Sequence, residues 1–120
     1  MGETYINVRV RRLPEDDRCE ELRLIVDTRE AYSWIPRRVL ERLDIKPVGK
    51  RKFKTICGNI IERELGHIFI EHEGDYAPTT VVFAEKGDAT VFGLHGMESL
   101  GLEIDPVTRQ IRKSEALLAL

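Results

Sequence analysis

The sequence predicts a mostly β domain that forms a small barrel and carries two short helices. Apolar and polar side chains alternate over residues 4–12, as expected of a strand with one buried face. Further short apolar runs follow, and Gly, Pro and paired acidic residues separate them at regular intervals. Many short strands joined by such turns are typical of a small β-barrel.

The individual elements can be placed along the chain. Strands are expected, in order, over residues 4–12, 20–26, 33–35, 76–84, 90–92, 102–104 and 110–113. A basic hairpin over residues 49–61 turns at Cys57 and Gly58, and its second arm continues to residue 72. One helix has Pro36 in its first turn, a position that suits proline, and the second helix spans residues 94–100.

Length and composition indicate a single globular domain over residues 1–120. The net charge of −2 gives no reason to expect nucleic acid or an anionic membrane as a partner. The apolar runs are too short to span a bilayer, and residues 1–5 lack the features of a secretory signal. We therefore expect a cytoplasmic protein, in which Cys19 and Cys57 stay reduced.

Two segments carry more specific information. Residues 24–28 read Leu-Ile-Val-Asp-Thr, and Ser-Trp-Ile-Pro follows at residues 33–36. Farther along, Val-Phe-Gly-Leu at residues 91–94 precedes the second predicted helix. In order and spacing, these segments and the basic hairpin between them resemble the catalytic segment, the second glycine segment and the flap of retropepsin-like aspartic proteases. The resemblance covers roughly residues 4–113 and implies a retropepsin-like acid-protease half-barrel.

The resemblance also implies a mechanism. Each subunit of a homodimer supplies one catalytic aspartate, here Asp27, and Thr28 braces the two loops across the two-fold axis. The paired carboxylates, about 3 Å apart, share one proton because two like charges at that distance cannot both ionise. Gly58 at the flap tip and Val91 would then border the substrate cleft. The substrate would be a peptide, and no cofactor is implied.

The loop after Asp27 departs from the family pattern of Asp-Thr-Gly-Ala, because Arg29 and Glu30 replace the glycine and the alanine. An arginine beside Asp27 favours the ionised carboxylate. One such arginine in each subunit opposes the shared proton, and Glu30 adds a further carboxylate to the cleft. We therefore expect a homodimeric homologue with weak or lost peptidase activity, which acts as a peptide-binding or assembly module.

Two alternatives remain open at this stage. In the first, Cys57 is the nucleophile of a thiol-dependent hydrolase or esterase, activated by the neighbouring basic residues and by a histidine such as His95. Its substrate would be a small ester, and the cleft would have been rebuilt by natural drift or by engineering. In the second, the chain is an active aspartic endopeptidase that tolerates Arg29. The three histidines share no ligand spacing with the cysteines, so no metal site is expected.

Overall fold

The computed structural model describes residues 2–115, which are mostly β. This part of the chain holds nine strands and two short helices, as the sequence predicts. The strands are β1 (Tyr5–Arg11), β2 (Glu20–Val26), β3 (Ser33–Pro36), β4 (Gly49–Lys54), β5 (Ile60–His72), β6 (Asp75–Ala84), β7 (Val91–Phe92), β8 (Leu102–Ile104) and β9 (Ile111–Lys113). The helices are α1 (Arg37–Arg42) and α2 (Leu94–Ser99).

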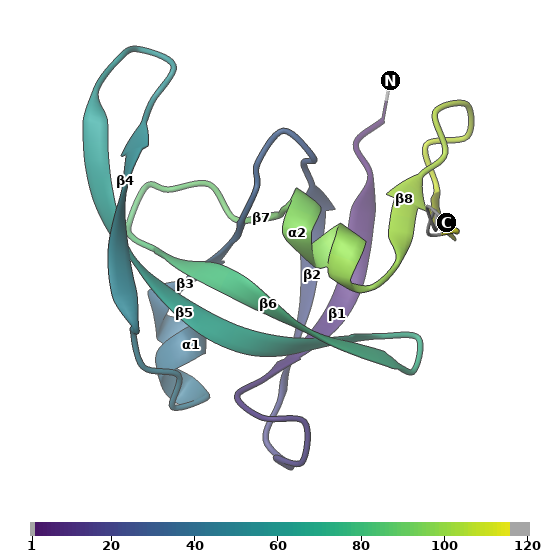
Figure 1. Cartoon of the computed structure of the whole chain (residues 1–120), viewed down its shortest axis with the longest axis horizontal. Coiled ribbons are helices and arrows are strands. Elements are labelled where there is room, and N and C mark those ends of the chain that lie inside the picture. Colours follow the sequence, from purple (N-terminus) through teal and green to yellow (C-terminus); the bar gives the residue numbers. More distant parts are fainter. Residues whose placement is uncertain (1, 116–120) are drawn as a thin grey trace, which may run out of the picture.

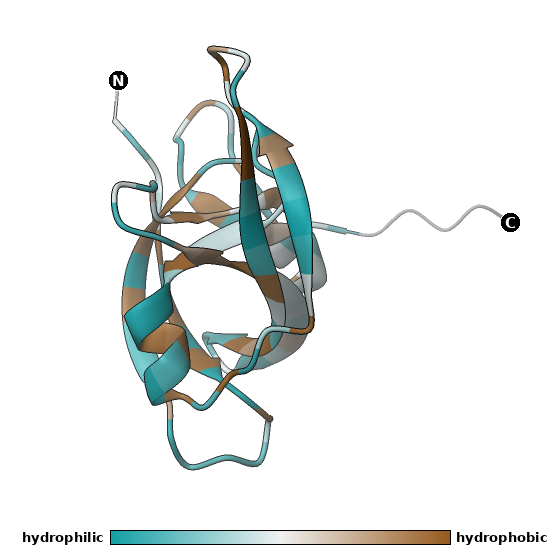
Figure 2. Ribbon diagram, turned by 90° about the vertical axis from the view of Figure 1, so that its left-hand side faces the viewer, coloured by the Kyte–Doolittle hydropathy of each residue, from teal (hydrophilic) through white to brown (hydrophobic). Residues whose placement is uncertain are grey.

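Seven strands form one sheet in the order β1-β2-β7-β3-β6-β5-β4, and a further pairing of β1 with β5 closes the first six into a barrel (Figure 1). The closing register pairs Arg9 with Glu71 and Arg11 with Phe69. In the side view of Figure 2, the closed strands form a ring in the lower part of the molecule. Strand β4 pairs with β5 alone, so the β4–β5 hairpin extends away from the barrel.

The core occupies the inside of this barrel. Along β1, Ile6, Val8 and Val10 are buried, whereas the residues between them are exposed, which confirms the predicted alternation. Helix α1 adds Leu40 to the core. Pro36 differs slightly from expectation, because it ends β3 and caps α1 rather than entering the first turn. The fixed φ of proline suits either position.

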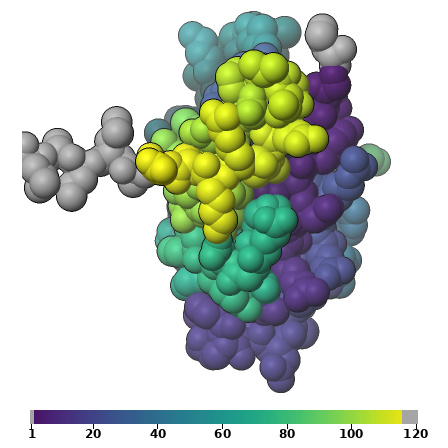
Figure 3. All heavy atoms as spheres, turned by 90° about the vertical axis from the view of Figure 1, so that its right-hand side faces the viewer, coloured from purple at the N-terminus to yellow at the C-terminus, as the bar shows by residue number. Residues whose placement is uncertain are grey.

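The C-terminal part of the described chain lies against the start of β1. Strands β8 and β9 form a separate hairpin, and the Oγ1 of Thr4 donates a hydrogen bond to the carbonyl of Arg109, 2.7 Å away. In Figure 3, this hairpin, the turn between β5 and β6, and β1 lie side by side on one face. Neither α1 nor α2 has the length and apolar character that crossing a membrane would require.

Candidate functional site

The loop that carries Asp27 joins β2 to β3, and β7 lies between these two strands. Strand β7 pairs with β2 in parallel and with β3 in antiparallel orientation. The Asp27 N–H donates to the carbonyl of Phe92 at 3.0 Å, and the Leu94 N–H donates to the carbonyl of Glu30 at 2.8 Å. The two sequence segments that point to a site are therefore held against each other by backbone hydrogen bonds.

Gly93 allows this close approach. A β-carbon at this position would lie 2.4 Å from the carbonyl oxygen of Tyr32, well inside van der Waals contact. The Gly93 N–H donates to the Oγ of Ser33 at 3.0 Å, and Ser33 is fully buried. A glycine is needed here because the backbone of the Asp27 loop occupies the space of a side chain.

Both carboxylate oxygens of Asp27 are bound by Arg29. The Nε and the backbone N–H of Arg29 donate to Oδ1, each at 3.0 Å, and Nη2 donates to Oδ2 at 3.2 Å. The side-chain hydrogen bonds from Arg29 hold the pKa of Asp27 below its usual value, although partial burial acts in the opposite direction. Asp27 is therefore kept ionised, as the sequence predicts. Thr28 is exposed beside it.

A hollow of about 330 Å³ opens beside Asp27, and we call it the Asp27 hollow. Glu30 and Val91 line it, so the structure brings these predicted site residues together with Asp27. The complete lining is Asp27, Glu30, Trp34, Ile61, Gly87, Asp88, Ala89 and Val91. Ile61 comes from the β4–β5 hairpin, and residues 87–89 come from the loop between β6 and β7. Cys57 and Gly58 do not line it.

The β4–β5 hairpin is docked against the Asp27 loop. The ring of Phe53 lies 5.0 Å from that of Trp34 and 6.2 Å from that of Tyr32, measured between centroids. Nη1 of Arg51 donates to the hydroxyl of Tyr32 at 2.9 Å. Arg51 and Phe53 alternate along β4 with Lys50, Lys52 and Lys54, so the lysines occupy the opposite face of the strand. That alternation is the sequence signal that could have revealed this contact.

Two arginines fix the base of the hairpin, and sequence reasoning did not single them out. Arg63 on β5 forms a bidentate ion pair with Asp88, in which Nε donates to Oδ2 at 2.6 Å and Nη2 donates to Oδ1 at 2.9 Å. Arg37 on α1 binds Glu64 at 2.5 Å and Glu85 at 2.7 Å. Hydrogen bonds from Arg63 and Arg37 hold the pKa values of Asp88 and Glu85 below their usual values. These contacts fix one wall of the Asp27 hollow.

The tip of the hairpin differs from the two-residue turn that the sequence suggests. The Thr55 carbonyl accepts a hydrogen bond from the Gly58 N–H, and the Thr55 N–H donates to the carbonyl of Asn59. Gly58 has φ +88, whereas Ile56 and Cys57 are not among the residues with positive φ. The loop is therefore a type I turn followed by a glycine bulge. Because Cys57 stands at a position open to most residues, its presence needs no special explanation.

The structure does not place Cys57 in contact with a histidine among the described residues. Cys57 is an exposed free thiol and makes no hydrogen bond to a histidine within residues 2–115. The ring of His95 instead lies edge-on to Tyr32, with 5.4 Å between the ring centroids. His95 and His67 line a separate hollow of about 360 Å³. Over the described chain, no three His, Cys, Asp or Glu side chains converge as metal ligands.

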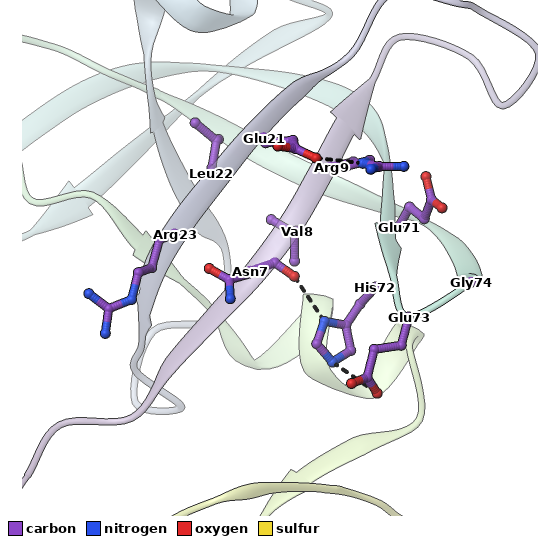
Figure 4. A pocket seen from close by; sticks show the side chains of 10 residues that line it. All are labelled: Asn7, Val8, Arg9, Glu21, Leu22, Arg23, Glu71, His72, Glu73 and Gly74. Carbon is purple, nitrogen blue, oxygen red and sulfur yellow. Dashed lines mark hydrogen bonds and ion pairs between the residues drawn. The ribbon is translucent and has the colours of Figure 1, made fainter.

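A larger hollow, of about 580 Å³, lies on another face, between β1, β2 and the turn from β5 to β6 (Figure 4). Its charged groups are engaged with neighbouring residues, for example Arg23 with the ring of Tyr5 and Glu71 with Arg11. The Nε of Arg9 donates to Glu21 at 2.9 Å, and Nδ1 of His72 lies 2.9 Å from the carbonyl oxygen of Asn7. None of the predicted site residues lines it. The Asp27 hollow, although smaller, is therefore the candidate site, because the predicted site residues line it.

No protein-family model matches the chain, and no curated protein matches it either. Function must therefore be inferred from the residues of the Asp27 hollow and their geometry.

Proposed function

We propose that this chain is one subunit of a retropepsin-like homodimer that binds extended peptides but cleaves them weakly or not at all. The β4–β5 hairpin would be the flap, and the Asp27 hollow would form part of the cleft. Three features support this proposal. The Asp27 loop packs against residues 91–94, the barrel presents this loop beside the hairpin, and Gly93 permits the close backbone approach.

The contact between Arg29 and Asp27 is the observation that carries the loss of activity. Aspartic-protease chemistry needs a pair of carboxylates that share one proton, so that one acts as base and the other as acid. Here Arg29 satisfies both oxygens of Asp27 and favours the charged form. A dimer would therefore hold two ionised carboxylates and would lack the acid that protonates the carbonyl of the peptide bond.

Peptide binding does not need that proton. The Asp27 hollow keeps apolar side chains from three elements, namely Trp34 from β3, Ile61 from β5 and Val91 from β7. An apolar hollow with a few polar groups at its edge is the usual form of a binding site. The tip of the hairpin also presents Ile56 and Ile60 to solvent, at 105% and 66% exposure. These side chains are available to a peptide bound beneath the hairpin.

The double variant Arg29→Gly, Glu30→Ala tests the proposal. It restores the family pattern and removes the donors that keep Asp27 ionised, so peptidase activity in mild acid should rise by about a hundredfold or more. Activity is measured on a broad peptide library, with dimer formation checked in parallel. Adding Asp27→Asn to the double variant should abolish the gain.

Two outcomes would contradict this function. If the double variant dimerises but cleaves no peptide, the loop is not the cause of the lost activity. If the unaltered protein already cleaves peptides in acid and Asp27→Asn stops it, the chain is an active aspartic endopeptidase.

A further inference from the structure

The Asp27 hollow has an apolar floor and open space above it. Trp34 and Val91 are 8% and 9% exposed and form the floor, and the half-buried Ile61 extends it toward the hairpin. Gly87 and Ala89 line another side with little or no side chain. The volume of about 330 Å³ is sufficient for one long side chain of a bound peptide.

Three acidic residues line this hollow, and the carboxylates of two of them are bound by arginines. Asp27 is bound by Arg29, and Asp88 is bound by Arg63 through two hydrogen bonds. Glu30 is exposed, and its carboxylate makes no hydrogen bond or ion pair with any residue that the structure describes. Among the described residues, Glu30 is therefore the one acidic residue of the hollow whose carboxylate has no directly bound partner.

None of the neighbouring cations forms an ion pair with Glu30, and Arg29 attracts it only through space. The guanidinium of Arg29 is engaged with Asp27, and its side chain is 89% exposed. On the hairpin, Arg51 is bound to the hydroxyl of Tyr32 and does not line the hollow. The lysines of β4 alternate with Arg51 and Phe53, so they occupy the other face of the strand.

We infer that the Asp27 hollow is a subsite for a long cationic side chain, arginine or lysine, of an extended peptide. This inference rests on the proposed peptide-binding function and specifies its ligand. The methylene stem of such a side chain lies along apolar residues while its charged end stays at the surface. Here the stem would lie on Val91 and Ile61, and the charged end would reach Glu30. Trp34 also lines the hollow, and its indole ring would attract the same cation.

Intrinsic fluorescence gives a direct test, because Trp34 is the only tryptophan of the chain. The unaltered protein is titrated with short peptides that carry arginine, lysine, citrulline, norleucine or glutamate at one position, and this position is varied along the peptide. At one position, arginine and lysine peptides should bind about tenfold more tightly than citrulline and norleucine peptides. The glutamate peptide should bind most weakly, and added salt should reduce the preference.

The variant Glu30→Gln should remove this preference while still binding the norleucine peptide. Glu98→Gln is the matched control, because Glu98 is also exposed, lies on α2 and does not line the hollow. It should retain the preference in full.

The outcomes separate the subsite from the function. If peptides bind without a preference for a cationic side chain, the subsite is overturned and the proposed function stands. The same conclusion follows if the preference persists in Glu30→Gln. A complete absence of peptide binding, with unchanged Trp34 fluorescence, overturns both.

Discussion

At the scale of single residues, the chemistry of the site depends on Arg29, two positions after Asp27. Arg29 can reach back to the carboxylate because the loop turns tightly here, with the Glu30 N–H donating to the Asp27 carbonyl at 3.1 Å. The stabilisation from a carboxyl with a lowered pKa is fully present above the pKa of the unfolded chain. It is lost as the pH falls through the folded value.

The pKa of Asp27 should therefore rise in Arg29→Gly, because the main group that stabilises the anion has been removed. Carbon-13 NMR of the side-chain carboxyl during an acid titration measures this directly. Asp105 is an internal control, because its low pKa depends mainly on the backbone N–H groups of Val107 and Thr108. An unchanged Asp27 titration would show that the ion pair does not form in solution.

Gly93→Ala should destabilise the fold by about 1–3 kcal/mol, because the new β-carbon would meet a backbone oxygen that cannot move without displacing the Asp27 loop. Urea unfolding measures the loss. Gly49→Ala is the matched control, since nothing lies within 4 Å of a β-carbon there and its φ is not positive. Equal stability of the two variants would contradict the close packing of the loop on residue 93.

At the scale of elements, the β4–β5 hairpin depends on a small aromatic contact. Phe53→Ala removes the packing on Trp34 and Tyr32, so the hairpin should open more often while the barrel stays folded. Amide hydrogen exchange over residues 49–61 should become faster, with little change in β1. Lys52→Ala alters the opposite face of the same strand and should leave the exchange unchanged. Equal protection in both variants would mean that Phe53 does not hold the hairpin.

Elements defined by local pattern could be predicted from the sequence, whereas pairings between distant segments could not. The alternation of Ile6, Val8 and Val10 identified β1, because every second side chain must enter the core. No local pattern shows that β1 closes the barrel on β5, or that β7 lies between β2 and β3. The tip of the hairpin was placed correctly at Cys57 and Gly58, but the two-residue turn type was wrong, because residue types alone do not fix the length of the loop.

The candidate site shows the same division. Asp27, Glu30 and Val91 were expected at one cleft and do line one hollow. The sequence did not assign Asp88, which comes from the loop after β6 and depends on Arg63 for its position. Such an ion pair joins residues from separate elements, so neither residue signals it alone.

At the scale of the whole molecule, the proposed chemistry and cleft require two copies of the chain. The resemblance to retropepsin-like proteases implies that the terminal segments, residues 1–5 and 117–120, pair between subunits. Residues 1 and 117–120 lie outside the described residues, but Thr4 is held by Arg109, which places the described N-terminal segment beside the C-terminal hairpin. Analytical ultracentrifugation at micromolar concentration should give a dimer. A single monomeric species would remove both the dimer and the two-carboxylate mechanism.

Acid should weaken the whole fold. Hydrogen bonds from arginines hold the pKa values of Glu71, Glu85 and Asp88 below their usual values. Each group stabilises the folded state above its unfolded pKa of about 4, and this contribution disappears as the pH falls through the lower folded pKa. The thermal midpoint should therefore fall as the pH is lowered from about 7 to about 3.

Arg63→Gln tests the origin of this acid sensitivity. Arg63→Gln removes the main cause that lowers the pKa of Asp88, so the midpoint should start lower near neutral pH and fall less steeply in acid. Arg23→Gln is the matched control, because it removes the same charge from a residue that contacts the ring of Tyr5 rather than a carboxylate. Its pH dependence should follow that of the unaltered protein. Identical slopes in all three proteins would mean that the Arg63–Asp88 pair does not contribute to the acid sensitivity of the fold.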